Sequence, residues 1–91
     1  MRKVIWIDLT GFSFWIRKYD GFPAHQIVAA GKRGEKIMIK LLNPATQRTF
    51  GVDSVNLVRW EAGSKPEGPF DQTALTVIEK IKEEVAKSAP H

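Results

Sequence analysis

Apolar and polar residues alternate most regularly between residues 35 and 60, in the middle of the chain. From residue 36 to residue 42, every second side chain falls on the same face of a strand. One face carries Ile37, Ile39 and Leu41, and the other carries Lys36, Met38 and Lys40. Residues 48–52 alternate in the same way, with Phe50 and Val52 on one face. Because Asn43-Pro44-Ala45-Thr46 between the two segments has the residue types of a β-turn, we predict a β-hairpin around which the rest of the chain packs.

Two shorter segments near the N-terminus also alternate. Residues 2–9 place Val4 and Trp6 on one face of a first strand, and residues 12–19 predict a second strand. Thr10-Gly11 lies between them, and glycine permits the backbone of a tight turn. We therefore expect these two strands to form a hairpin.

The remaining β segments are short. A third strand is predicted at residues 26–30, followed by a basic loop, Gly31-Lys32-Arg33-Gly34, that leads into the central hairpin. After that hairpin, residues 53–56 favour one 3₁₀ turn. Residues 57–60 are expected to form the strand that closes the sheet.

The C-terminal third of the chain predicts a linker and a helix. Residues 61–69 are rich in Gly, Pro, Ser and charge, which is typical of a linker. The helix is predicted over residues 70–87, with Asp71 as its N-cap. Its apolar stripe recurs at helical spacing and consists of Ala74, Ile78, Ile81 and Val85. We expect this stripe to be buried against the sheet face that carries Val4 and Trp6, or against a second copy of the chain.

Together these elements predict a mainly β protein with a C-terminal α-helix, of the α+β class. The order of five short strands with a single helical turn before the last one resembles the small SH3-like barrels, over residues 2–60. This resemblance implies a five-stranded barrel or a strongly bent antiparallel sheet. It does not carry over the binding of proline-rich peptides, because the acidic loop of true SH3 domains is represented only by Asp20. We expect one domain, made of a β part (1–60), the linker (61–69), the helix (70–87) and a frayed tail (88–91).

Length and composition favour a single soluble domain. The chain has 91 residues, of which 43% are hydrophobic and 26% charged, as in ordinary globular proteins. It has no cysteine, hence no disulfide framework and no thiolate metal site. No apolar run approaches the length of a membrane span. These features lead us to expect a cytoplasmic protein without a membrane partner.

Charge is distributed unevenly along the chain. The formal net charge is +4, but residues 1–65 carry a net charge of +6 and residues 66–91 a net charge of −2. A basic β part raises the chance of an anionic partner such as nucleic acid. The ordinary alternative is that the lysines and arginines only keep the surface soluble.

Aromatic and basic residues give a more specific hypothesis. Aromatic rings beside cations are what single-stranded nucleic acid requires, because bases stack on rings and phosphates attract cations. The candidate residues come from the second strand, the basic loop and the polar face of the central hairpin: Trp15, Arg17, Tyr19, Lys32, Arg33, Lys36 and Lys40. The competing interpretation is that the tryptophans belong to the core.

The sequence offers no constellation for catalysis. His25 is the only internal histidine, the acidic residues of the β part are scattered, and no phosphate-binding loop is present. We therefore predict a non-catalytic binding module with no metal and no cofactor. Nucleic acid is the first choice of partner, and a protein surface or self-association is the alternative. The residues expected to bury the helix or join two copies are Val4, Trp6, Ala74, Ile78, Ile81 and Val85. An active site formed between subunits is a distant third hypothesis.

Overall fold

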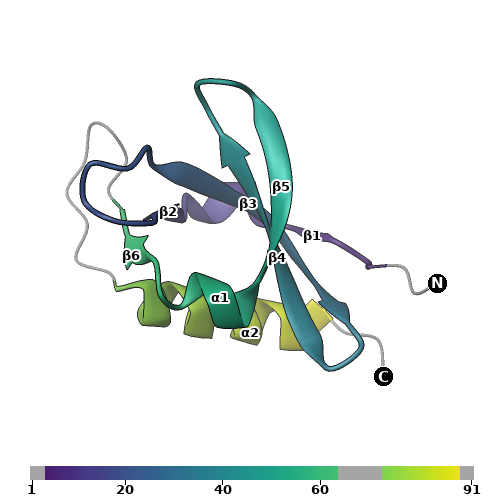
Figure 1. The fold of residues 1–91 in the computed structure, drawn as a ribbon. Coiled ribbons are helices and arrows are strands. Elements are labelled where there is room, and N and C mark those ends of the chain that lie inside the picture. Colours follow the sequence, from purple (N-terminus) through teal and green to yellow (C-terminus); the bar gives the residue numbers. More distant parts are fainter. Residues whose placement is uncertain (1–3, 64–72, 89–91) are drawn as a thin grey trace.

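The computed structural model of the chain describes residues 4–63 and 73–88. It consists of a six-stranded antiparallel sheet and a C-terminal helix (Figure 1). The elements are β1 (Ile7–Asp8), η1 (Thr10–Phe12, a 3₁₀ helix), β2 (Trp15–Arg17), β3 (His25–Arg33), β4 (Lys36–Asn43), β5 (Arg48–Asp53), α1 (Ser54–Leu57), β6 (Glu61–Ala62) and α2 (Ala74–Ser88). The predicted class, mainly β with a C-terminal helix, is confirmed.

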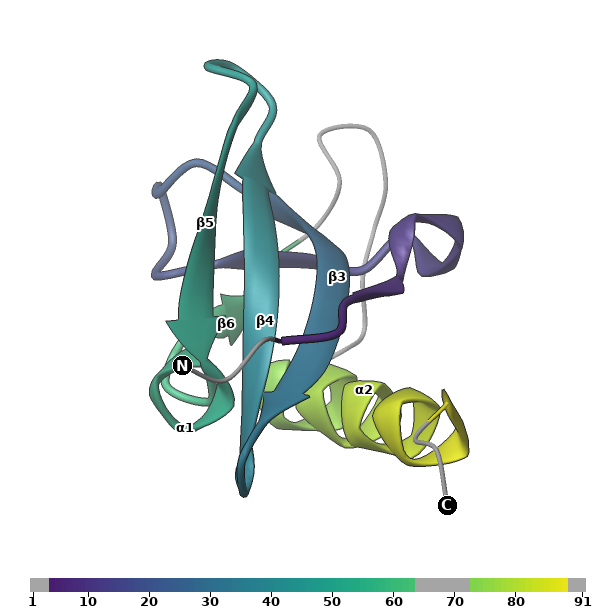
Figure 2. The ribbon, with the colours of Figure 1, turned by 90° about the vertical axis from the view of Figure 1, so that its right-hand side faces the viewer.

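The sheet is open. Its strand order is β5-β4-β3-β2-β6, and β1 pairs with the far end of β3. Within the described residues, the two end strands β5 and β6 do not pair with each other. Figure 2 shows β5 as the outermost strand on one side of the sheet.

The central hairpin is confirmed. β4 and β5 pair without interruption, with Lys40 opposite Gly51 and Leu41 opposite Phe50. The side chain of Asn43 accepts a hydrogen bond from the backbone N–H of Ala45 at 3.0 Å, which is the local contact expected of asparagine at a turn.

The sheet has an inner face toward α2 and an outer face. Ile27 of β3 and Ile39 and Leu41 of β4 are fully buried on the inner face. The register of β3 shifts between Ile27 and Ala29, and this β-bulge places Ala30 in the core as well. Opposite residues of paired strands share a face. The polar side of β4, with Lys36, Met38 and Lys40, therefore forms the outer face.

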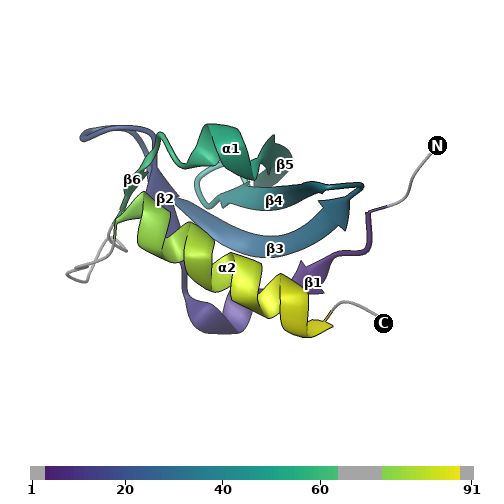
Figure 3. The same ribbon diagram turned by 90° about the horizontal axis from the view of Figure 1, so that it is seen from below.

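The helix α2 covers the inner face (Figure 3). The hydroxyl of Thr73 accepts a hydrogen bond from the N–H of Thr76 at 3.1 Å, as an N-cap side chain does. The predicted stripe is buried in the core together with the fully buried Val77. One expectation is wrong: the stripe does not pack against the face that carries Val4 and Trp6. These two residues lie on the outer face, because Ile7 pairs with the core residue Ala30 and itself takes the inner face.

The predicted hairpin at Thr10-Gly11 is also wrong. β1 and β2 do not pair with each other; both pair with β3, with Ile7 opposite Ala30 and Ile16 opposite His25. The Asp8 carboxylate accepts hydrogen bonds from the N–H and the hydroxyl of Thr10, which starts the 3₁₀ turn η1 instead of a reversal. The chain then continues in the same direction along the edge of β3.

Several boundaries differ from the sequence prediction. β3 extends to Arg33, so the expected basic loop is mostly strand and the turn begins at Gly34, whose φ is 65°. The expected 3₁₀ turn is the short helix α1, in which Asp53 caps the N–H of Val55 at 2.9 Å. Residues 57–60 do not form the last strand, which is β6. The predictions for most of the linker, for the Asp71 cap and for residues 89–91 lie outside the described residues.

Candidate functional site

Five aromatic side chains meet at one end of the inner face and form what we call the aromatic cluster: Tyr19, Phe22, His25, Phe50 and Trp60. The ring of Phe22 stacks on that of His25 with centroids 5.7 Å apart and planes 15° apart. Phe50 and Trp60 meet the His25 ring edge-on, at 5.6 and 6.2 Å. Phe22 also contacts Tyr19 at 5.1 Å and Trp60 at 5.9 Å. Each such pair contributes about 0.5–1.5 kcal/mol beyond the area it buries.

The loop between β2 and β3 holds the first part of the cluster. The Tyr19 carbonyl accepts the N–H of Phe22 at 3.0 Å, and Gly21 supplies the left-handed φ of 91° that this turn requires. The ring nitrogen Nδ1 of His25 lies 2.8 Å from the carbonyl oxygen of Pro23. Because a carbonyl only accepts, Nδ1 carries the proton and donates it. His25 is therefore a packing residue that fixes the loop against β3.

Burial changes steeply across the cluster. His25 at its centre is 4% exposed, whereas Phe50 and Tyr19 at its rim are 42% and 56% exposed. Phe22 and Trp60 are half-buried between them. The cluster thus combines a buried aromatic centre with exposed Tyr and Phe rings at its edge.

Arg17 ties the two sides of the cluster together. Its Nη1 lies 3.6 Å from Oδ1 of Asp20 in the loop, and its Nε lies 3.6 Å from Oε2 of Glu61 in β6. Both carboxylates are largely exposed, so each pair contributes at most about 1 kcal/mol. The contacts orient the Tyr19–Phe22 turn relative to the strand that follows Trp60.

A shallow hollow adjoins the cluster at Trp60. Val58 and Leu75 line it together with Trp60, and they are 39% and 58% exposed. The apolar surface at this end of the molecule therefore continues from the loop to the first turn of α2.

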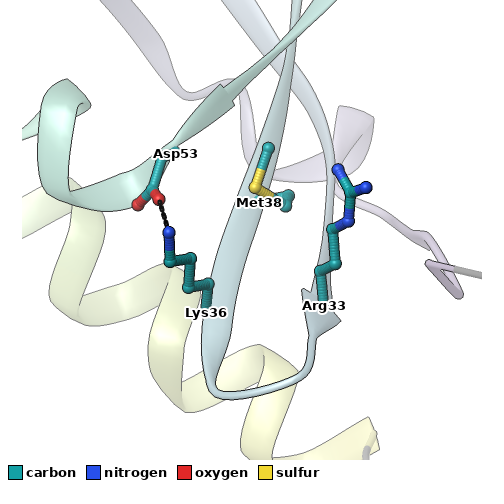
Figure 4. Close-up of a pocket in the computed structure, with 4 residues that line it drawn as sticks. All are labelled: Arg33, Lys36, Met38 and Asp53. Atoms are coloured by element: carbon teal, nitrogen blue, oxygen red, sulfur yellow. Dashed lines mark ion pairs between the residues drawn. The ribbon is translucent and has the colours of Figure 1, made fainter. Parts of the chain in front are cut away.

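The outer face carries the basic residues of the β3–β4 hairpin. In register, Arg33 lies opposite Lys36, and Lys40 lies on the same face two positions beyond Met38. Figure 4 shows Arg33 and Lys36 on either side of Met38 around a second hollow, with Lys36 Nζ 3.7 Å from Oδ2 of Asp53. Lys40 Nζ lies 4.3 Å from the ring centre of Trp6.

The structure does not bring the seven residues expected to bind nucleic acid together in one place. Arg33, Lys36 and Lys40 lie on the outer face, Lys32 lies opposite Ile37 in the inner-face register, and Tyr19 belongs to the aromatic cluster. Arg17 is engaged with the two carboxylates.

Trp15 is buried, at 8% exposure, and so offers no free ring face for a base. It alternates with the core residues Phe14 and Ile16 and lies outside the core cluster. Its Nε1–H is buried without a hydrogen-bond partner among the described residues.

The described residues contain no group of three His, Asp or Glu side chains placed to hold a metal ion. No helix in this part of the chain is long and apolar enough to cross a membrane. Comparisons with protein-family models, with curated proteins and with solved structures find no match.

Sequence reasoning did not find the aromatic cluster. From the sequence, Phe22 is expected in a turn, Phe50 in the core of the hairpin and Trp60 at the end of a strand. The one local signal is the density of aromatic residues around the Asp20-Gly21 turn. The contacts of Phe50 and Trp60 with Phe22 and His25 join residues that are far apart in sequence, so only the fold brings them together.

Proposed function

We propose that this chain is a non-catalytic protein-binding module with SH3-like topology, and that the aromatic cluster is its binding surface. The strand path supports the topology: β2 to β5 pair in sequence order, the single turn of α1 follows, and β6 returns to pair with β2. The observation that carries the function is the contrast between the buried His25 and the exposed Tyr19 and Phe50. Aromatic rings held rigid by packing lose little entropy when a partner covers them.

The rim of the surface also fits a protein partner. Asp20 and Glu61 provide polar groups beside the rings, and Trp60 extends the apolar area toward Val58 and Leu75. An apolar centre with a polar rim is typical of protein interfaces.

Selection of peptides from a random displayed library on the immobilised full chain tests this function. We expect enriched peptides to bind the chain and to lose about tenfold or more in affinity when Tyr19→Ala removes a rim ring, a loss of about 1.4 kcal/mol. Phe12→Ala is the matched control, because Phe12 is 47% exposed but lies outside the cluster. Peptides indifferent to Tyr19→Ala, or no enrichment at all, would contradict the proposal.

A second candidate function is binding of nucleic acid through the outer face. The observation that favours it is the common face of Arg33, Lys36 and Lys40, with the partly exposed ring of Trp6 beside them. Contacts to phosphates release counterions, so affinity for single-stranded or duplex oligonucleotides should fall steeply with salt. Arg33→Glu should weaken binding, whereas Lys82→Glu on α2 should not. Binding that is independent of salt would reject this function.

A further inference from the structure

The free edge of β5 adjoins the aromatic cluster. β5 is the last strand of the sheet on its side, and Arg48, Thr49, Phe50 and Gly51 are all exposed. Along an edge strand, alternate residues turn their N–H and C=O groups away from the sheet, where a further strand can pair with them. Figure 2 shows no described strand beyond β5.

This edge lacks most of the features that usually prevent strand addition. β5 contains no proline and no lysine, and its pairing with β4 runs without a register shift from Arg48 to Asp53. Natural proteins normally protect such edges with proline, charged side chains or bulges, and the charges of β5 are confined to its two ends, at Arg48 and Asp53. A six-residue edge that neither proline nor a bulge interrupts, next to exposed aromatic rings, is therefore suited to a ligand strand that neutralises Arg48.

We propose that the partner binds as an extended peptide that adds a strand to the edge of β5, an inference that rests on the proposed protein-binding function. Main-chain hydrogen bonds would give this mode affinity, and side chains at alternate positions would give it specificity.

Two side chains of β5 define what the peptide must carry. Phe50 and Arg48 lie two positions apart and therefore on the same face, which is the face of the aromatic cluster. Phe50 would pair best with an aromatic or β-branched residue directly opposite it on the added strand. Arg48 has no ion-pair partner among the described residues, so it favours an acidic neighbour. The peptide should thus present an apolar and an acidic residue two positions apart.

The test uses two blocked peptides of equal composition, TVTFTET and TVTFETT. In the first the phenylalanine and the glutamate fall on one face of a strand, and in the second they fall on opposite faces. We expect TVTFTET to shift the amide resonances of residues 48–53 and to slow hydrogen exchange at alternate amides of β5. We expect TVTFETT to bind more weakly. Equal binding, or shifts without protection of the β5 amides, would overturn the strand-addition mode.

A charge swap tests the partner of Arg48. Arg48→Glu should weaken TVTFTET by about fivefold, near the upper range for an exposed ion pair. The same variant should strengthen binding of TVTFTKT, in which lysine replaces the glutamate. Arg59→Glu, at another exposed position, is the control and should change neither affinity. Failure of the swap would reject the assignment of the acidic position.

The outcomes separate this inference from the proposed function. Peptides that shift Tyr19 and Trp60 but leave the β5 amides unprotected would support the aromatic cluster as a binding surface and reject strand addition. A peptide that protects the β5 amides but leaves the resonances of Tyr19 and Trp60 unshifted would support strand addition and reject the aromatic cluster as the binding surface. Protection of β5 that rises with protein concentration in the absence of peptide would show that a second copy occupies the edge, and would overturn the proposal.

Discussion

Gly31 allows the N-terminal segment to cross the outer face of the sheet. A methyl group at this position would lie 2.7 Å from Cγ1 of Val4 and would collide with the backbone carbonyl of Ile5. Only a hydrogen at Gly31 leaves room for that backbone. Trp6 can then reach the side chain of Lys40.

Replacing Gly31 by alanine should therefore destabilise the protein, whereas replacing Gly51 by alanine should not. Alanine in a strand is ordinarily favoured over glycine by about 0.5–1 kcal/mol, but a clash of this kind costs about 1–3 kcal/mol. We expect Gly31→Ala to lower the free energy of unfolding by about 1 kcal/mol and to shift the indole resonance of Trp6. Gly51→Ala, which meets no atom within 4 Å, should be neutral or slightly stabilising. Urea titration of the two variants measures the difference, and a destabilised Gly51→Ala would contradict this account.

His25 combines ring packing with one hydrogen bond, and two substitutions separate these contributions. His25→Phe keeps a ring between Phe22 and Trp60 but leaves the Pro23 carbonyl without its donor, so we expect a loss of about 1–2 kcal/mol. His25→Ala also removes the ring and should cost about 2–4 kcal/mol. Equal losses in the two variants, measured by urea unfolding, would show that the rings contribute little.

Asp8 gives the folded protein a specific pH dependence. The N–H of Thr10, and to a lesser degree its hydroxyl, hold the pKa of the Asp8 carboxyl below its usual value. A lowered pKa in the folded state means that the stabilisation is complete above the ordinary carboxyl range and is lost as the pH falls through the folded pKa. In an NMR titration, Thr10→Ala should raise the pKa only part of the way, because the backbone bond remains. A full return to the ordinary value would contradict the leading role of that bond.

At the scale of the elements, α2 is a structural part of the domain. Ile78 and Ile81 are fully buried against the inner face, whereas Leu75 on the same helix is 58% exposed. We expect Ile78→Ala to cost about 2–5 kcal/mol in the free energy of unfolding, and Leu75→Ala to stay within about 0.5 kcal/mol. A comparable loss for both variants would indicate that Leu75 is covered in solution.

Elements with strong local signals are the ones that the sequence predicted. The β4–β5 hairpin and α2 follow from alternation, turn residues and helical spacing. The N-terminal hairpin failed because Thr10-Gly11 is compatible with both a reversal and a 3₁₀ turn. The hydrogen bond that the Asp8 side chain accepts from Thr10 favours the 3₁₀ turn. β1 and β2 then both pair with β3, and this tertiary pairing has no recognisable pattern in the sequence.

At the scale of the whole molecule, the middle of the sheet should be its most stable part. β3 and β4 are paired on both sides and bury Ile27, Ile39 and Leu41 completely, whereas β1 and β6 each contribute two residues. We expect the slowest hydrogen exchange at amides of β3 and β4, and exchange at least tenfold faster in β1 and β6, because local opening is easiest where few contacts are lost. Uniform protection across all strands would contradict this order.

Charge and composition favour a binding module as a hypothesis, but they do not indicate where on the fold its surface would lie. The residues chosen from the sequence included Tyr19, which lies at the rim of the aromatic cluster, and Trp15, which is buried. Alternation distinguishes the two faces of a strand, but it does not reveal which face another segment covers. The aromatic cluster depends on the approach of the Phe22 loop to Trp60, and that approach follows from the return of β6 to β2.

The composition of the aromatic cluster also bears on how the protein is made. Its rings come from the β2–β3 loop, from the start of β3, from β5 and from the residue just before β6, so they emerge from the ribosome at different times. β2, β3, β4 and β5 are neighbours in sequence and can pair early, whereas the pairing of β2 with β6 must wait until β6 has emerged. Until Trp60 has emerged, the rings of Phe22 and His25 lack one of the partners that cover them. The surface proposed for the partner is therefore complete only after Trp60 has emerged, and a partner that binds it would distinguish chains that stop before this residue from longer ones.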